Sequence, residues 1–379
     1  MGGGNASAGA AGAGLGGGTS GGSAGVSGQA GSGGVGASAG SSGSSGAGAA
    51  GGASGGTGGG GTGGGGTGGG GTGGGGTGGG GTGGGGTGGG GTGGAPTCVN
   101  GKSSAIPRGI ALNLFVDRTL SMFSQNKFNN VQQAWSQFAS NNSLAMDVGL
   151  SVAPAVSGSA NCGGAAYQPP ELNFAPLPGQ ANAITNALQT IGQGAGPAHM
   201  EAILNGGTAA LKSFAPSGDQ QPVLLIITDW TTGTDSCNTS PSFLGSIAAA
   251  ALSASPHVMT WVIDMGGGSS GGVLNSIAKD GGSDEAIANG SSTSDVRSGL
   301  EAATRPCRFA APASSAGGAL SLRRSSPASQ IFSQVPSIAQ CGNNSGNRWY
   351  SLGKSLVLCP LACVQQPPSA LYEITVTCT

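Results

Sequence analysis

The first 94 residues carry no Asp, Glu, Lys or Arg, and they hold 55 of the 84 glycines in this 379-residue chain. From Thr57 onward the unit Thr-Gly-Gly-Gly-Gly repeats. Glycine loses the most backbone entropy on ordering, and this stretch has almost nothing to bury in return. We therefore expect residues 1–94 to form a disordered, low-complexity spacer, so that any packed core is built from residues 95–379.

The charges of the chain are few and balanced. The chain has 13 Lys and Arg residues and 14 Asp and Glu residues, and it contains no cluster of basic residues. This balance argues against nucleic acid or an anionic membrane surface as the main partner. The longest apolar runs, such as 223–227, are far shorter than the roughly 20 residues of a membrane span. No signal peptide is visible after Met1. The oligomeric state stays open.

The chain has eight cysteines, an even number that favours disulfides. Zinc sites favour paired C-x-x-C knuckles, which are absent, and only two histidines are present. Disulfides form in oxidising compartments, so we expect an extracellular or cell-envelope protein carried on the glycine-rich spacer. Cys359 and Cys363 are close enough in sequence to pair locally, although the backbone there decides the pairing.

Apolar strand-like runs alternate with amphipathic helical segments through the middle of the chain. The predicted strands are 110–116, 144–152, 171–174, 223–228, 258–263 and 286–288. The predicted helices are 126–140, 182–191, 199–214, 241–253, 273–278 and 293–303. This alternation predicts an α/β fold with a doubly wound, mostly parallel sheet over residues 95–306.

The pattern changes after residue 306. Short strand-like segments follow one another between turns, at 320–322, 330–335, 348–352, 355–358 and 372–377. Four of the eight cysteines follow Cys307 in this region. We therefore expect residues 307–379 to form a β-rich appendage that disulfides hold together and that packs on the α/β domain.

Two apolar strands end in aspartate. The first runs into Asp117-Arg-Thr119-Leu-Ser121, and the second ends in Ile-Ile-Thr-Asp229. In an open α/β sheet, ligands bind beyond the carboxyl ends of the strands. Two carboxylates with two hydroxyls form a suitable oxygen ligand set for Mg²⁺, Mn²⁺ or Ca²⁺. The alternative is structural: Asp117 caps a turn, and the hydroxyls satisfy turn backbone.

These motifs resemble the von Willebrand factor type A (vWA) domain, over roughly residues 107–306. The resemblance implies a Rossmann-like sandwich with a metal-ion-dependent adhesion site (MIDAS), where a partner's carboxylate completes the shell of a divalent cation. Matched by position, the metal ligands are Asp117, Thr119, Ser121 and Asp229. The C-terminal segment Leu358-Cys-Pro-Leu-Ala-Cys363 resembles secreted or envelope-associated members of myxobacteria-like bacteria.

Two residues, Ala198 and Trp230, depart from the family pattern at the rim of the expected site, and a histidine lies beside the first of them. Ala198 stands where the family has a threonine, so one oxygen ligand is lost. His199 follows it; it is either an additional ligand suited to Mn²⁺ or Zn²⁺, or simply the start of a helix. Trp230 replaces a small residue and narrows the site. On this fold a Cys162–Cys237 disulfide would rigidify the same rim.

The sequence thus predicts a surface-exposed adhesion module that binds an acidic side chain of a protein ligand through a divalent cation. The alternative is a structural envelope protein whose vWA fold has lost metal binding. An enzyme is not expected, because neither histidine lies beside a recognisable nucleophile.

Overall fold

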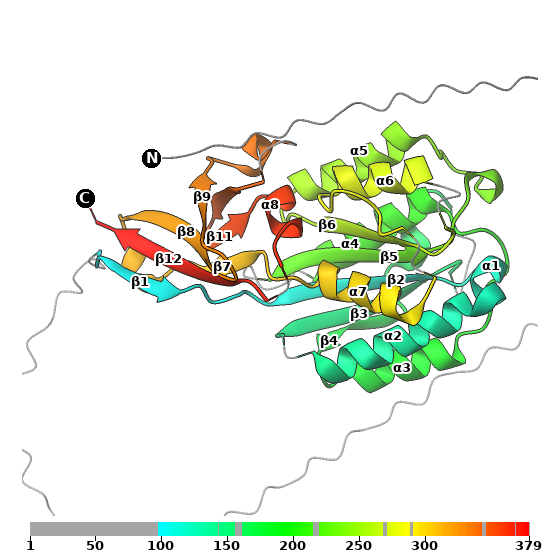
Figure 1. The fold of residues 1–379 in the computed structure, drawn as a ribbon. Coiled ribbons are helices and arrows are strands. Elements are labelled where there is room, and N and C mark those ends of the chain that lie inside the picture. The colour runs from blue at the N-terminus through cyan, green and yellow to red at the C-terminus, as the bar shows by residue number, and fades with distance from the viewer. Residues whose placement is uncertain are drawn as a thin grey trace, which may run out of the picture. The chain divides into compact units, whose positions relative to one another are not determined.

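A computed structural model describes residues 98–142, 144–155, 161–214, 220–267, 271–288, 291–342, 346–367 and 369–378. The expected spacer, residues 1–94, lies outside this part of the chain. The described residues form two sheets (Figure 1). One has five strands and is flanked by helices, and the other has seven strands. No helix in the described ranges has the length and apolar character needed to cross a membrane.

The five-stranded sheet has the order β4-β3-β2-β5-β6. Its strands are β2 (Ile110–Asp117), β3 (Met146–Ala153), β4 (Leu172–Pro176), β5 (Gln221–Thr228) and β6 (Met259–Asp264). The central strands pair in parallel, and only β4 runs antiparallel. Every residue of β2, β5 and β6 is buried, as their near-continuous apolar sequences predict. The doubly wound, mostly parallel α/β fold is confirmed.

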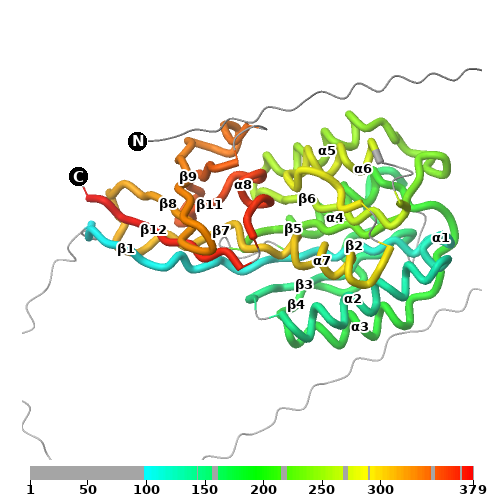
Figure 2. Tube along the Cα trace, viewed as in Figure 1, coloured from blue at the N-terminus to red at the C-terminus, as the bar shows by residue number. Residues whose placement is uncertain are grey.

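Helices cover both faces of this sheet (Figures 1 and 2). One face carries α2 (Lys127–Asn141), α3 (Ala181–Thr190) and α7 (Thr293–Ala303). The other carries α4 (Met200–Phe214), α5 (Pro241–Ser253) and α6 (Gly271–Asp280). Side chains alternate along each strand, so β2 sends Leu112 and Leu114 into one core and Phe115 into the other. Each face of the sheet therefore has its own hydrophobic core.

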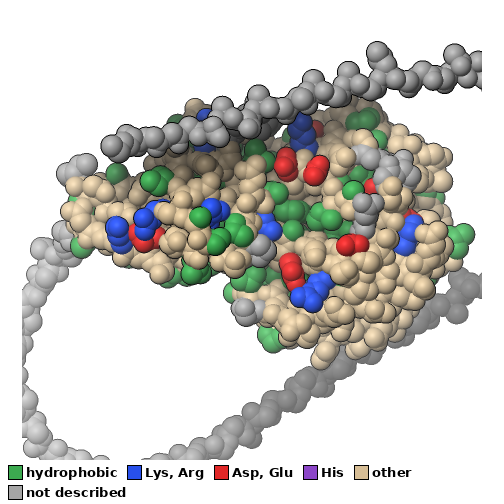
Figure 3. All heavy atoms as spheres, viewed as in Figure 1, with side chains coloured by type: hydrophobic (Ala, Val, Ile, Leu, Met, Phe, Trp, Pro, Cys, Tyr) green, Lys and Arg blue, Asp and Glu red, His purple; other side chains and the backbone are tan. Residues whose placement is uncertain are grey.

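The seven-stranded sheet has the order β1-β12-β8-β9-β10-β11-β7. Its strands are β1 (Gly101–Ser104), β7 (Arg308–Ala310), β8 (Ala319–Ser326), β9 (Gln330–Gln334), β10 (Arg348–Leu352), β11 (Ser355–Leu358) and β12 (Leu371–Thr377). Buried Phe309 and Trp349 belong to its core. On its outer face Lys102 and Arg323 flank Glu373, and basic side chains beside an acidic one are visible there in Figure 3.

Polar contacts join this second sheet to the α/β body. Cys307 N–H donates to Gln221 Oε1 at 3.1 Å, and the Arg308 guanidinium donates to the Gln220 carbonyl at 2.9 Å. The Arg305 guanidinium donates to the carbonyl of Val364, in the short helix α8 (Pro360–Val364). Gln221 is the first residue of β5 and Gln220 directly precedes it. The second sheet therefore lies at the end of the α/β sheet away from the carboxyl ends of its strands.

The structure adds elements that sequence patterns did not predict. β1 is a fully exposed four-residue strand without apolar alternation, and it pairs with β12 in the second sheet. β7 and α8 are also new, as is a one-turn helix α1 (Leu120–Phe123). The strand expected at 286–288 is only a single bridge to β6. Short 3-10 turns occur at Ser124–Asn126, Ala165–Tyr167, Thr232–Thr234, Ala313–Ser315 and Ile338–Gln340.

Four disulfides join the eight cysteines as Cys98–Cys378, Cys162–Cys237, Cys307–Cys363 and Cys341–Cys359. Cys359 and Cys363 therefore do not pair with each other, which corrects the local pairing considered from their spacing. Cys359 directly precedes α8 and Cys363 is the fourth residue of this helix, and each bonds to a different segment. Both partner cysteines precede α8 in the chain, so the disulfides hold α8 to the residue before β7 and to the segment between β9 and β10.

Gly164 makes the tightest backbone contact between the loop after β3 and helix α4. Its φ is +76°, and a Cβ atom there would lie 2.5 Å from both the Ala202 carbonyl oxygen and the Gly206 nitrogen. We expect Gly164→Ala to lower the free energy of unfolding by about 3 kcal/mol or more, because backbone atoms cannot move aside as a side chain can. Denaturant unfolding measures this change.

Gly192→Ala is the matched control. A Cβ atom at Gly192 meets nothing within 4 Å, so the change is expected to stay within about 0.5 kcal/mol. Equal stability of the two variants would contradict the close approach of the loop to α4.

Candidate functional site

The carboxyl ends of β2 and β5 place two aspartates at one edge of the α/β sheet. The strands pair in parallel with Val116 beside Ile227, so the chain leaves both strands at the same level. Asp117 is the last residue of β2, and Asp229 follows the last residue of β5. Both aspartates border a groove with a volume of about 750 Å³. Its lining is Asp117, Thr119, Leu120, Ser121, Ser124, Lys127, Gly196, Pro197, Ala198, Asp229, Trp230, Thr231, Thr234 and Gly266.

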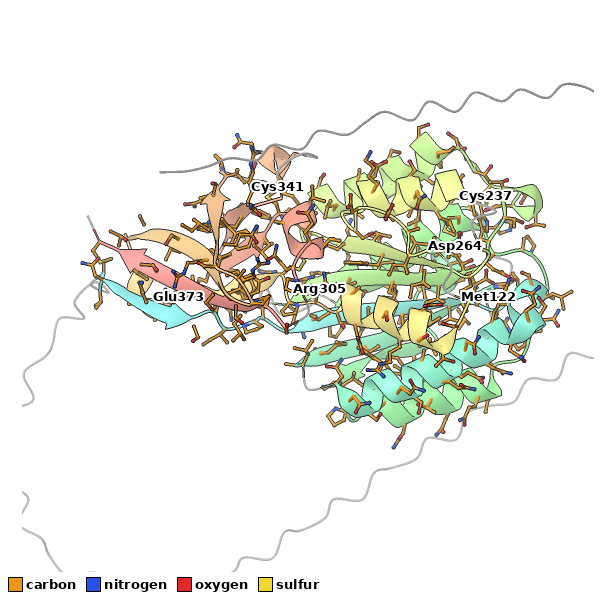
Figure 4. All side chains as sticks on the ribbon, in the orientation of Figure 1. Met122, Cys237, Asp264, Arg305, Cys341 and Glu373 are labelled. Atoms are coloured by element: carbon orange, nitrogen blue, oxygen red, sulfur yellow. A yellow bond between two sulfur atoms is a disulfide. The ribbon has the colours of Figure 1, made fainter. Side chains whose placement is uncertain are left out.

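The loops around this groove lie at the end of the α/β body opposite the second sheet. Figure 4 labels Met122, Cys237 and Asp264 at this end, whereas Glu373 lies in the second sheet and Cys341 lies in the segment between its strands β9 and β10. Asp264 ends β6, and its Oδ1 accepts the Gly266 N–H at 2.7 Å. Three adjacent parallel strands thus finish in or beside an aspartate at one edge.

Asp117 is a buried carboxyl with a defined partner on each oxygen. Its Oδ1 accepts the Thr119 N–H at 2.8 Å, and its Oδ2 accepts the Thr228 hydroxyl at 2.6 Å. Burial raises the pKa of the Asp117 carboxyl to about 6, and the charge of Asp229 adds slightly to that rise. The hydrogen bonds from Thr228 and Thr119 lower the pKa and so oppose the larger effect of burial.

A chain of side-chain oxygens continues from this carboxyl to Asp229. The Thr119 and Ser121 hydroxyl oxygens lie 3.1 Å apart, and the Ser121 hydroxyl donates to Asp229 Oδ1 at 2.8 Å. The structure therefore brings the four sequence-predicted ligands together. Carboxylate and hydroxyl oxygens are the donors that Mg²⁺, Mn²⁺ and Ca²⁺ accept, so this ligand set fits a hard divalent cation.

Lys127 occupies the other side of Asp229. Its Nζ lies 2.8 Å from Asp229 Oδ2, and the two side chains are 12% and 2% exposed. No sequence pattern indicated this lysine, although it is the first residue of the helix that follows the Asp117 motif. An ammonium group therefore already neutralises one carboxylate of the site.

Arg118 fixes the loops that border the groove. Its guanidinium donates to the carbonyls of Pro154, Ala155 and Gly192 at 2.7, 2.9 and 3.1 Å. Its own carbonyl accepts the Gly194 N–H at 2.8 Å. This residue of the Asp117 motif is 9% exposed and ties the loop after β2 to the loops after β3 and α3. Its role is to hold the rim of the groove.

The three rim residues singled out from the sequence lie in different positions. Ala198 and Trp230 line the groove and are almost fully buried. His199 is not among the lining residues; its Nδ1 lies 2.7 Å from Asp235 Oδ1. The histidine is therefore held beside the site by Asp235 and does not take the place of the missing threonine oxygen.

The Asp235 side chain is the buried centre of this rim, and no sequence pattern predicted its role. Its carboxylate, 0% exposed, accepts the N–H groups of Met200 and Cys237 at 2.9 Å and the Trp230 Nε1–H at 3.0 Å. The Cys162–Cys237 disulfide joins the same loop to the loop after β3. Cys162, Cys237, His199, Asp235 and Glu201 come close together here, but the two sulfurs are bonded to each other and are not free thiolates.

A weak sequence signal existed for each missed residue. Lys127 opens the amphipathic helix after the metal motif, where a cation is unfavourable, and Asp235 lies two residues before a cysteine. Thr228 directly precedes Asp229 in a strand whose other residues are mostly apolar. None of these positions indicates its partner without the fold.

The Asp117 carboxyl is expected to make the metal-free protein less stable as pH rises from about 4 to about 6. Its pKa is about 6 in the folded chain and 3.8 ordinarily, so between these values the folded chain holds a proton that the unfolded chain has lost. The free energy of unfolding then falls by about 1.4 kcal/mol per pH unit from this group. Denaturant unfolding in the presence of a chelator measures it.

Asp117→Asn is the control, since it removes the titrating group. The difference in unfolding free energy between the natural chain and this variant should change over that pH window and level off above it. A constant difference would contradict the raised pKa.

Removing the Asp235 carboxylate is expected to destabilise the domain strongly. Asp235→Ala leaves several buried donors without an acceptor, which costs about 3–5 kcal/mol. Glu171→Ala, at an exposed acidic position, should change stability by no more than about 0.5 kcal/mol. Thermal and denaturant unfolding of both variants measure the contrast, and a stable Asp235→Ala protein would show that the rim does not depend on this carboxylate.

No protein-family model and no curated protein matches this chain. Among solved structures, it is similar to a von Willebrand factor type A protein from Catenulispora acidiphila, at 10% identity and a TM-score of 0.35 over 75% of this chain and 66% of that one. It is also similar to a pilus adhesin from Lactobacillus rhamnosus, at 14% identity and a TM-score of 0.36 over 71% of this chain and 38% of that one.

A third similar structure is an aerotolerance-related membrane protein from Bacteroides fragilis, at 16% identity and a TM-score of 0.29 over 41% of this chain and 67% of that one. The matches span about two thirds or less of the length of these proteins. With identities below 25% and TM-scores below 0.5, they say nothing about function, which we infer from the side chains of this chain alone.

Proposed function

We propose that this chain is a protein-binding module that presents a divalent cation to an acidic side chain of its partner, as in vWA-type adhesion. The ligands are Asp117, Thr119, Ser121 and Asp229. The observation that carries the proposal is the convergence of two carboxylates and two hydroxyls, from separate strand ends, in one open groove. Because Mg²⁺ keeps several waters, it needs only one or two carboxylates.

The walls of the groove suit a protein partner. Leu120, between the two hydroxyl ligands in sequence, is 66% exposed at the groove, and Pro197 and Trp230 also line it. A partner that brings a carboxylate to the cation would bury apolar surface on Leu120 at the same time. Ala198 supplies no side-chain oxygen, so water or the partner takes that position.

Binding rather than catalysis agrees with the positions of the two histidines. His199 contacts Asp235, and His257 Nδ1 lies 2.8 Å from the Leu252 carbonyl oxygen, outside the groove lining. Neither is placed to activate a nucleophile there. The four disulfides support an extracellular or cell-envelope location.

The second candidate function is a structural envelope module that binds no metal. Lys127 favours it, because an ammonium group already pairs with Asp229. Ala198 favours it as well, because it removes one oxygen from the rim. The two candidates differ in their response to metal alone.

Mn²⁺ is expected to raise the melting temperature of the chain through mass action, since it binds only the folded site. Ser121→Ala removes a hydroxyl ligand that touches Asp229 and should weaken Mn²⁺ binding about tenfold. Ser246→Ala is the matched control, because this exposed hydroxyl donates only to the Phe243 carbonyl in α5. Isothermal titration with Mn²⁺ and Mg²⁺, and melting curves with each ion, give the readouts.

Unchanged melting temperature and no heat of binding at millimolar Mn²⁺ or Mg²⁺ would reject the adhesion module in favour of the structural one. Equal affinity of the natural chain and Ser121→Ala would move the cation away from the proposed ligands.

A further inference from the structure

The residues that lead into helix α2 adopt a costly backbone conformation. Gln125 has φ 55° and ψ 26°, and Asn126 has φ 60° and ψ 15°. In the ranges that the structure describes, Asp284 is the one other non-glycine residue with positive φ. A left-handed conformation is unfavourable for an L-residue, although less so for asparagine than for glutamine. Two such residues in succession place Lys127 at the first position of α2.

Lys127 gains nothing from the helix that it begins. The N-terminus of a helix carries a partial positive charge, so an ammonium group there is unfavourable. The Asn126 side chain makes no capping hydrogen bond. The Lys127 side chain is also only 12% exposed, so it has lost most of its hydration. The backbone conformation and the position of the lysine are both unfavourable for the helix itself. Such local strain is typical of residues in functional sites.

What compensates these costs lies in the groove. Lys127 Nζ is 2.8 Å from Asp229 Oδ2, while Asp229 Oδ1 accepts the Ser121 hydroxyl. Both oxygens of this carboxylate are therefore engaged, and the lysine supplies positive charge at the metal ligands. Two acidic side chains face the groove, and Lys127 is the one basic residue among the described groove-lining residues.

We propose that Lys127 is an internal counter-ion of the metal site, which a divalent cation must displace before it binds. The lysine holds Asp229 in place when no metal is bound and leaves the carboxylate when the cation arrives. It therefore sets the cation concentration at which the site becomes able to bind a partner. This inference rests on the proposed function and adds a regulatory element to the same site.

The displacement follows from charge. A divalent cation brings twice the charge of the ammonium group and can contact the hydroxyls of Thr119 and Ser121 together with the carboxylates. While the ion pair is intact, Asp229 is not available to the metal. The apparent metal affinity is therefore the intrinsic affinity multiplied by the fraction of the protein in which the pair is broken. The groove is open to solvent, so the flexible lysine side chain has room to leave.

The test compares Mg²⁺ binding by the natural chain, Lys127→Met and Lys212→Met. Methionine keeps much of the length of lysine without its charge. Lys212 is an exposed lysine in the last turn of α4, outside the groove lining, and provides the same change in net charge. We expect Lys127→Met to bind Mg²⁺ about tenfold more tightly than the natural chain and Lys212→Met to bind within about twofold of it, because only Lys127 competes for the ligands.

Two further readouts separate displacement from simple repulsion. The ¹⁵Nζ resonance of Lys127 should change from that of a buried, paired ammonium to that of a solvated one as Mg²⁺ is added. Without metal, Lys127→Met should melt at a lower temperature than the natural chain, and saturating Mg²⁺ should abolish that difference.

The outcomes distinguish this inference from the proposed function. Equal Mg²⁺ affinity of the natural chain and Lys127→Met, or an unchanged Lys127 resonance on saturation, overturns the counter-ion role and leaves the metal site standing. Binding by Lys127→Met alone overturns both displacement of the lysine by the cation and metal-dependent binding by the natural chain. No binding by either protein overturns both.

Discussion

The parallel pairing of β2 with β5 is the interaction on which the site depends. Every residue of both strands is buried, and their register sets Val116 beside Ile227. A slip of one residue would exchange the two faces of a strand and expose its apolar side chains to the wrong core, so burial fixes the register strongly. The positions of Asp117 and Asp229 at one edge are thus a product of hydrophobic packing. The hydrophobic core thus maintains the strand alignment that brings the two carboxylates together.

Charge balance at this edge involves more than the metal ligands. Asp117 is buried and Asp229 is nearly so, and each carboxylate has partners that reduce the cost of burial. Asp235, beside them, is satisfied entirely by donors from the rim. The three aspartates therefore differ in role: one is held by hydroxyl and backbone groups, one by a lysine, and one organises the surrounding loops. This division explains how three acids lie close together in a folded chain with a single nearby ammonium group.

Sequence patterns predicted the α/β fold because its strands are continuous apolar runs and its helices have clear amphipathic spacing. They also indicated Asp117, Thr119, Ser121 and Asp229, since strand-ending polar residues in parallel strands converge. They did not predict β1, which has no apolar alternation and forms only because β12 offers it an edge. Lys127 and Asp235 were missed because their partners lie 102 and 36 residues away in sequence. The disulfide partners of Cys359 and Cys363 depend on the position of α8. This helix is too short for a pattern of apolar residues to predict it.

The Cys98–Cys378 disulfide has a mechanical consequence. Cys98 precedes β1 and Cys378 follows β12, and the two strands run antiparallel, so the bond closes the same end of the strand pair. Tension that reaches Cys98 from the preceding chain is shared between β1 and β12 by a covalent link. Under such a pull, the hydrogen bonds between two strands normally break one at a time from the end of the pair. Here the disulfide holds that end of β1 and β12 together, so the first hydrogen bond does not carry the tension alone. The domain can thus bear load from its N-terminal side without losing its outermost strand.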